Sequence, residues 1–136
     1  MSIHKNSKKD SLIRIYILYS EISQKNQDII KDMTKNMENI IELKFIDIKQ
    51  FVSNSFFDKY MYKAKDFFNY TSPETYYRLF IPNLFPDYDK VLYLDSDIIV
   101  CEDLTELYNT DIDNLYAGVV SVYKYLRSKG LKVERF

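Results

Sequence analysis

Residues Val91–Val100 read VLYLDSDIIV, an apolar run that two aspartates, Asp95 and Asp97, interrupt. An unpaired carboxylate is costly in apolar surroundings, and two neighbouring carboxylates repel each other. A divalent cation relieves both costs, and carboxylate oxygens are ligands that Mg²⁺ and Mn²⁺ prefer. Because residues i and i+2 of a strand lie on the same side, we predict that both aspartates bind one cation at the end of a strand.

Three other interpretations of this aspartate pair are weaker. In the first, Asp95 and Asp97 only end a strand and cap a turn. In the second, Asp95 begins a calcium-binding EF-hand loop, but Ile99 and Val100 stand where that loop needs an oxygen ligand and a glycine. In the third, Asp95 is the nucleophile of a phosphatase that resembles the haloacid dehalogenases. Those enzymes need a lysine and a second acidic pair far downstream, and only 39 residues follow Asp97.

The composition is that of a soluble globular domain. The chain has 136 residues, 19 basic and 20 acidic, and its net charge of -1 gives no reason to expect a nucleic-acid partner. We find no transmembrane run and no signal peptide, and the single cysteine, Cys101, cannot form an internal disulfide. These features predict a cytoplasmic protein. Glycine-rich phosphate loops are absent, which argues against P-loop and dinucleotide-binding enzymes.

Strands and helices alternate along the sequence. The apolar and β-branched runs at 12–19, 42–48, 90–94 and 116–123 predict strands. Helices are predicted after Ser23, with an apolar face of Ile29, Ile30, Met33, Met37, Ile40 and Ile41, near 58–68, after Ser72-Pro73-Glu74 with Pro82 as its kink or end, at 103–108 and at 124–130. This order predicts a mostly parallel α/β sheet, in which ligands bind beyond the carboxyl ends of the strands.

A longer string, TYYRLFIPNLFPDYDKVLYLDSDIIV at 75–100, closely resembles glycosyltransferase family 8, which includes lipopolysaccharide galactosyl- and glucosyltransferases and glycogenin. The string RIYILYSEIS at 14–23 and the strand at 45–48 look like other strands of that family. The resemblance implies a GT-A fold, a Rossmann-like nucleotide-sugar-binding domain. It also implies a retaining, metal-dependent enzyme that transfers a hexose from a UDP-sugar to a saccharide acceptor, such as lipopolysaccharide or another surface glycan.

The same resemblance assigns roles to individual residues. Asp95 and Asp97 are expected to bind Mn²⁺ or Mg²⁺, and Arg78, Asp95 and Ser96 to lie against the nucleotide-sugar. Arg78 matches a helix arginine that faces the sugar diphosphate in family members. Its alternative interpretation is a surface arginine in an ion pair. The alternative for the whole chain is a non-catalytic remnant, or an interaction module that binds metal or nucleotide.

The chain also departs from the family pattern. The residues Ser2–Asn6 resemble the end of the helix that follows the family's first, base-binding strand, so we expect that strand to be missing. Past Gly130 the family continues into segments that supply a late metal-binding histidine and the acceptor site, and His4 cannot take that role by position. Ser121 stands where many members have an aspartate. We therefore expect residues 1–136 to form one partial GT-A domain, whose unfinished sheet edge favours self-association.

Overall fold

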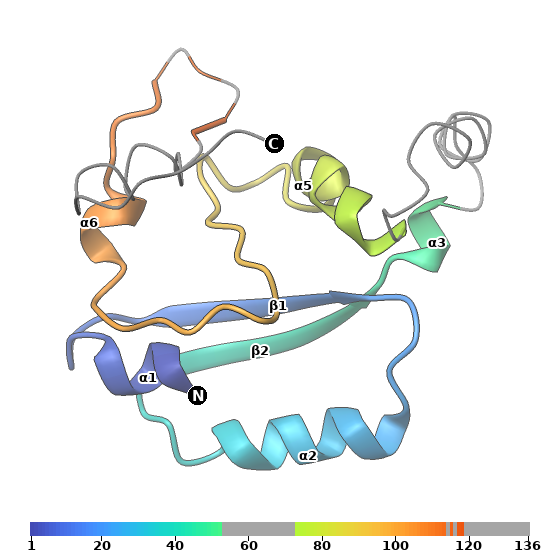
Figure 1. Ribbon diagram of the computed structural model, residues 1–136, viewed down its shortest axis with the longest axis horizontal. Helices are drawn as coiled ribbons and strands as arrows, with labels where there is room; N and C mark the ends of the chain where they lie inside the picture. Colours follow the sequence, from blue (N-terminus) through green and yellow to red (C-terminus); the bar gives the residue numbers. More distant parts are fainter. Residues whose placement is uncertain (53–72, 114, 116, 119–136) are drawn as a thin grey trace, which may run out of the picture.

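Two parallel strands and short helices alternate along the chain in a computed structural model, which describes residues 1–52, 73–113, 115 and 117–118. The elements are, in chain order, α1 (Ser2–Asn6), β1 (Ile13–Tyr19), α2 (Gln24–Thr34), β2 (Ile40–Asp47), α3 (Lys49–Val52), η1 (Pro73–Phe80), α5 (Ile81–Leu84) and α6 (Thr105–Tyr108). In Figure 1, α2 lies on one side of the strand pair, while α5 and α6 lie on the other. The prediction of an α/β chain with a parallel sheet is confirmed for this part.

Both strands of the sheet, IRIYILY and IIELKFID, are runs of mainly isoleucine, leucine and aromatic residues. Strand β1 pairs in parallel with β2, from Arg14 opposite Glu42 to Tyr19 opposite Asp47, with an irregularity at Ile13. Beyond the end of β2, the backbone N–H of Ile48 still donates to the carbonyl of Tyr19 at 2.8 Å. The strands predicted at 12–19 and 42–48 are confirmed, although β2 begins two residues earlier than expected, at Ile40.

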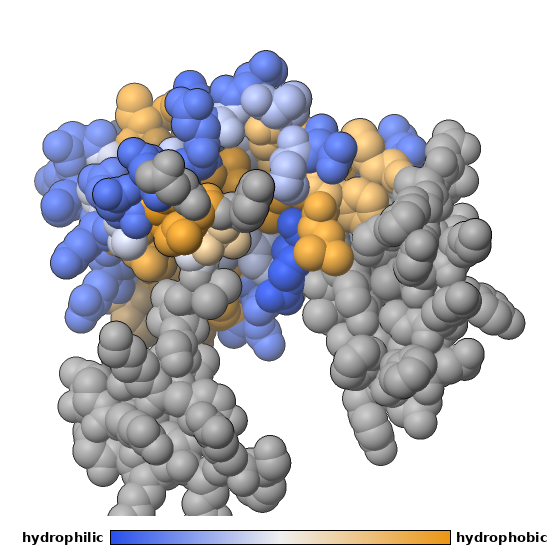
Figure 2. Space-filling model, turned by 90° about the horizontal axis from the view of Figure 1, so that it is seen from above, coloured by the Kyte–Doolittle hydropathy of each residue, from blue (hydrophilic) through white to orange (hydrophobic). Residues whose placement is uncertain are grey.

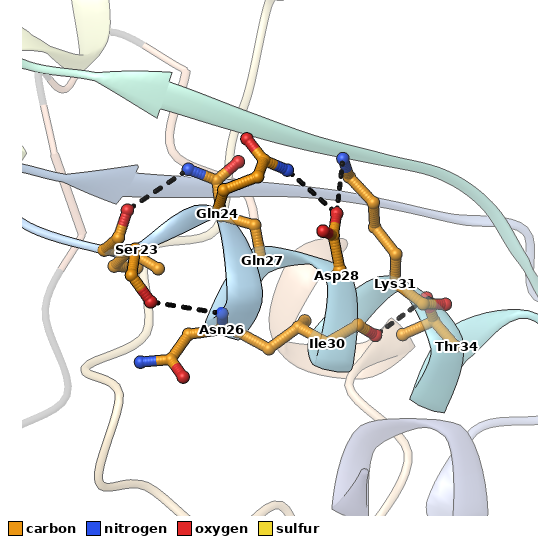
Figure 3. Close-up of polar contacts among 9 residues, drawn as sticks. Ser23, Gln24, Asn26, Gln27, Asp28, Ile30, Lys31 and Thr34 are labelled. Carbon is orange, nitrogen blue, oxygen red and sulfur yellow. Dashed lines mark hydrogen bonds and ion pairs between the residues drawn. The ribbon is translucent and has the colours of Figure 1, made fainter.

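Helix α2 begins as the sequence predicts and ends sooner. The Ser23 side chain accepts a hydrogen bond from the backbone N–H of Asn26, which satisfies one of the free donors of the first turn (Figure 3). The helix ends at Thr34, whose hydroxyl donates to the carbonyls of Ile30 and Lys31. The prediction that Met37 and the isoleucines at 40 and 41 continue the apolar face is wrong, because the chain turns after Thr34 and those isoleucines begin β2.

The two faces of the sheet are covered differently. On the α2 side, the Lys31 ammonium lies over the Phe45 ring, 5.7 Å from its centroid. On the opposite side, Tyr16 packs edge-on against Phe85, with 4.8 Å between ring centroids, and its hydroxyl lies 2.7 Å from that of Tyr88. The segment that follows α5 therefore rests on β1 through an aromatic cluster.

The described core is small. Ile48 is 1% exposed, and Tyr77 and Val100 are the other buried apolar residues among those described. Large apolar side chains remain exposed, and Figure 2 shows apolar groups at the surface between hydrophilic ones. Among the described residues, no helix combines the length and the hydrophobicity that a bilayer crossing needs.

The helix predicted after Ser72 is present in two parts. Pro73 and Glu74 occupy its first turn as expected, while Ser72 itself lies outside the described residues. The chain changes from a 3-10 helix to an α-helix between Phe80 and Ile81, and Pro82 lies inside the short α5 rather than at its end. The short helix predicted at 103–108 is confirmed as α6. The predicted elements at 58–68 and 124–130, and most of that at 116–123, also lie outside the described residues.

The strand predicted at 90–94 is wrong for the described structure. Residues 90–101 include no strand, and β1 has β2 as its one neighbour in the described sheet. A strand exists through hydrogen bonds to a neighbouring strand, and no described strand lies beside this run to accept or donate them. Instead, Val100 is held to α1, where its N–H donates to the Ser2 hydroxyl at 3.1 Å and its carbonyl accepts from the Asn6 amide at 2.8 Å.

Candidate functional site

The two aspartates predicted to bind metal lie in a turn. The backbone N–H of Ile98 donates to the carbonyl of Asp95 at 3.2 Å, so Ser96 and Asp97 occupy the middle of a four-residue turn. The expectation that both carboxylates project from the same side of a strand is wrong, because the chain bends at this point. Asp95, Ser96 and Asp97 are all exposed. The turn presents their oxygens to solvent, where an ion and its water ligands can approach.

Asp95 is oriented by two side chains. Its Oδ1 lies 3.2 Å from a guanidinium nitrogen of Arg78 and accepts a hydrogen bond of 2.9 Å from the Tyr93 hydroxyl. The guanidinium also lies over the Tyr93 ring, 4.7 Å from its centroid. Arg78 and Asp95 are 43% and 49% exposed, so their ion pair contributes little to stability. Its effect is to fix the two groups beside each other.

Tyr93 is a site residue that the sequence argument missed. Partial burial, and then the hydrogen bond to Asp95, raise the pKa of its phenol above the ordinary value. The phenol therefore stays protonated at neutral pH and remains a donor to the carboxylate. Tyr93 precedes Asp95 by two positions, but the alternation of a strand does not account for their contact, because residues 90–101 form no strand.

The helix that carries Arg78 is tied to the end of β1. Ser20, the residue after β1, donates from its hydroxyl to the carboxylate of Glu74 at 3.2 Å, and Glu74 lies one turn before Arg78 in η1. A hollow of about 1580 Å³ runs along β1 and is also lined by all four residues predicted for the site, Arg78, Asp95, Ser96 and Asp97. The structure thus places these residues around one hollow, which includes the carboxyl end of β1.

The donor atoms of the turn fit a hard cation. Among the described residues, no group of three or more histidine, cysteine, aspartate or glutamate side chains surrounds one point. The turn offers two carboxylates and the Ser96 hydroxyl, all oxygen donors. Mg²⁺ and similar ions are commonly held by one or two carboxylates, with waters and substrate phosphates as the other ligands. The Nδ1 atom of His4 pairs instead with the amide oxygen of Asn39.

Comparison with known proteins defines the class to which this α/β chain belongs. The family model described as glycosyl transferase family 8 matches residues 1–134, which is nearly the whole chain. The chain belongs to glycosyl transferase family 8. This membership confirms the resemblance drawn from the sequence at 75–100. No solved structure matches the chain.

Individual relatives share shorter stretches with the chain. It is 45% identical over 49 residues to "Glycosyltransferase 8 domain-containing protein 1" of Xenopus laevis, a match that covers 36% of this chain and 14% of that protein. It is 45% identical over 51 residues to "Probable galacturonosyltransferase 14" of Arabidopsis thaliana, covering 38% and 10%. It is 52% identical over 42 residues to "Glycosyltransferase GlyE" of Streptococcus pneumoniae, covering 31% and 10%. Each match spans a small part of the relative.

Proposed function

We propose that the protein forms the donor-binding part of a GT-A hexosyltransferase that uses a UDP-sugar and a divalent cation, Mn²⁺ or Mg²⁺. The acceptor is a saccharide, and the transfer retains the configuration at the anomeric carbon. Membership of family 8 supports glycosyl transfer, and a relative named as a galacturonosyltransferase supports a hexose-type donor. The observation that carries the proposal is the contact of Arg78 with Asp95 beside the exposed turn of Asp97.

Each residue of the site has a part in holding the donor. Asp95 and Asp97 supply the carboxylates for the cation, and the Ser96 hydroxyl lies against the nucleotide. The guanidinium of Arg78 presents several N–H donors in a planar fork, a geometry that matches phosphate oxygens. The Tyr93 ring lies under that guanidinium and its hydroxyl holds Oδ1 of Asp95. Tyr93 therefore keeps the positive and negative groups of the site in a fixed relation before the donor arrives.

The chemistry follows from where charge develops. When the bond between the sugar and UDP breaks, negative charge grows on the diphosphate that departs. A cation bound to the aspartates would offset this charge as a Lewis acid. Arg78 adds a second positive group on the same diphosphate, and positive groups aimed at developing charge are an effective source of rate acceleration. Both aspartates are exposed, so a cation held by them would remain open to the phosphate oxygens of the donor.

Titration of the chain with UDP, by calorimetry with and without Mn²⁺, tests this assignment. Arg78→Ala is expected to weaken UDP binding about 10- to 100-fold, since hydrogen bonds to charged groups contribute about 1.5–3 kcal/mol. Asp97→Asn is expected to remove the dependence on Mn²⁺. Lys49→Ala is the matched control, because Lys49 is also an exposed basic residue in a surface ion pair, with Glu21, and it lies outside the hollow. UDP affinity that is equal in the two variants would refute the role of Arg78.

A further inference from the structure

Two donors contact the same oxygen of Asp95. A guanidinium nitrogen of Arg78 lies 3.2 Å from Oδ1, and the Tyr93 hydroxyl donates to this oxygen at 2.9 Å. Each carboxylate oxygen has about two lone-pair positions for such partners, so Arg78 and Tyr93 together occupy Oδ1. A cation that binds through Oδ1 must therefore displace one of the two donors.

Charge makes Arg78 the donor that opposes a cation. The phenol of Tyr93 donates without a charge, but a guanidinium is always positive in a protein. A divalent ion on either oxygen of Asp95 lies within several ångström of that positive group, and like charges at such a distance repel each other even in water. Arg78 therefore lowers the affinity of Asp95 for a cation as long as the ion pair persists.

The ion pair joins two separate segments that line the same hollow. Arg78 belongs to η1 and Asp95 begins the turn of Ser96 and Asp97, and all four residues line the hollow of about 1580 Å³. Arg78 and Asp95 are both exposed to solvent, to 43% and 49%. A diphosphate in the hollow can therefore reach the guanidinium and a cation on the turn together.

The Tyr93 ring supports Arg78 independently of Asp95. The guanidinium lies over the ring, 4.7 Å from its centroid, and such a cation–π contact does not need the carboxylate. The guanidinium can therefore leave Asp95 and stay beside the ring. Its planar fork of N–H donors then becomes available to phosphate oxygens, which it fits.

We propose that Arg78 competes with the divalent cation for Asp95 until a sugar diphosphate draws the guanidinium away. Before the donor binds, Arg78 is the counter-ion of Asp95 and keeps the affinity for the cation alone low. The diphosphate accepts hydrogen bonds from Arg78, which releases Asp95 to the cation. Cation and donor then bind cooperatively, and each raises the affinity for the other by the same factor. This inference rests on the proposed function, because the diphosphate belongs to the proposed donor.

Titration of the whole chain with Mn²⁺ alone, followed by the electron paramagnetic resonance signal of the free ion, tests the competition. Arg78→Gln removes the charge, so it is expected to bind Mn²⁺ about 3- to 10-fold more tightly than the unchanged chain, the range set by repulsion from one partly screened charge. Arg78→Met, a second uncharged variant, is expected to show the same gain. Lys49→Gln is the matched control, because Lys49 is also exposed and forms an ion pair of 3.2 Å, with Glu21, outside the hollow. It is expected to leave the Mn²⁺ affinity unchanged.

The same titration with excess UDP, corrected for the Mn²⁺ that free UDP binds, tests the coupling. UDP is expected to raise the Mn²⁺ affinity of the unchanged chain more than that of Arg78→Gln, so the gain of the variant shrinks or disappears.

Three results would overturn the proposal. In the first, both Arg78 variants bind Mn²⁺ alone no more tightly than the unchanged chain, or Lys49→Gln shows the same gain. In the second, UDP raises the Mn²⁺ affinity equally in the unchanged chain and in Arg78→Gln. Both results leave the proposed donor site standing, because UDP still strengthens Mn²⁺ binding there. In the third, UDP changes the Mn²⁺ affinity of none of the chains, and the proposed function fails together with this inference.

Discussion

Replacing Ile48 tests where the core of the described structure lies. Ile48 is 1% exposed and follows β2, where its N–H still bonds β1. Ile48→Ala removes three carbons, and each buried methylene contributes about 0.8 kcal/mol, which gives about 2.4 kcal/mol. The cavity left behind adds to this value, so a loss of roughly 3 kcal/mol in the free energy of unfolding is expected, within the range of about 2–5 kcal/mol for such changes.

Urea denaturation followed by circular dichroism measures this loss. With a slope of about 2 kcal/mol per molar urea, a loss of roughly 3 kcal/mol lowers the midpoint by about 1.5 M. The matched control is Ile41→Ala, the same substitution in β2 at a residue that is 45% exposed. Its effect is expected to be less than half as large. If the two variants lose equal stability, the placement of the core at Ile48 is wrong.

Two further predictions concern local contacts. Ser23→Ala is expected to cost about 1 kcal/mol of stability by removing the cap on the N–H of Asn26, while Ser23→Gly costs only a few tenths; equal losses in a melt would contradict the capping role. Hydrogen bonds from Thr105 and from the backbone N–H of Lys8 lower the pKa of Asp103. A lowered pKa contributes stability that is present above the ordinary aspartate pKa and is lost as the pH falls through the lowered one. The deficit of Asp103→Asn, measured by urea titration from neutral to acidic pH, should therefore be full near pH 7 and shrink in acid, and a deficit that does not change with pH would contradict this assignment.

Short-range sequence patterns correctly predicted the elements whose formation depends mainly on neighbouring residues. The β-branched run of β1, the Ser23 cap and the Pro73-Glu74 helix start each act within a few residues, so they are visible without the fold. The end of α2 was missed because Met37 and the isoleucines that begin β2 fit a helical spacing by coincidence. Apolar spacing alone does not separate the last turn of a helix from the start of the next strand.

The sequence predicted which residues lie at the candidate site, but it did not predict how they are arranged. Arg78 and Asp95 were named from the sequence, and the structure places them 3.2 Å apart. The strand expected before Asp95 is absent from the described structure, because strand formation depends on a neighbour that no local pattern reveals. The hydrogen bond from the Tyr93 hydroxyl to Asp95 also depends on the folded arrangement of the turn, which no local sequence pattern reveals. The assignment of the whole chain to one partial domain and to the cytoplasm stays a prediction.

The most direct test of the account is a thermal melt of the chain with Mn²⁺ and UDP, each alone and together. A ligand that binds only the folded state raises its stability, by about 2.7 kcal/mol at a hundredfold excess over its dissociation constant. We expect a rise in Tm that needs both ligands, disappears in Asp97→Asn and persists in Asp89→Asn, the same change at an exposed aspartate outside the hollow. A cooperative melt with no shift, or a shift that Asp97→Asn leaves intact, would contradict a donor site built on Asp95 and Asp97.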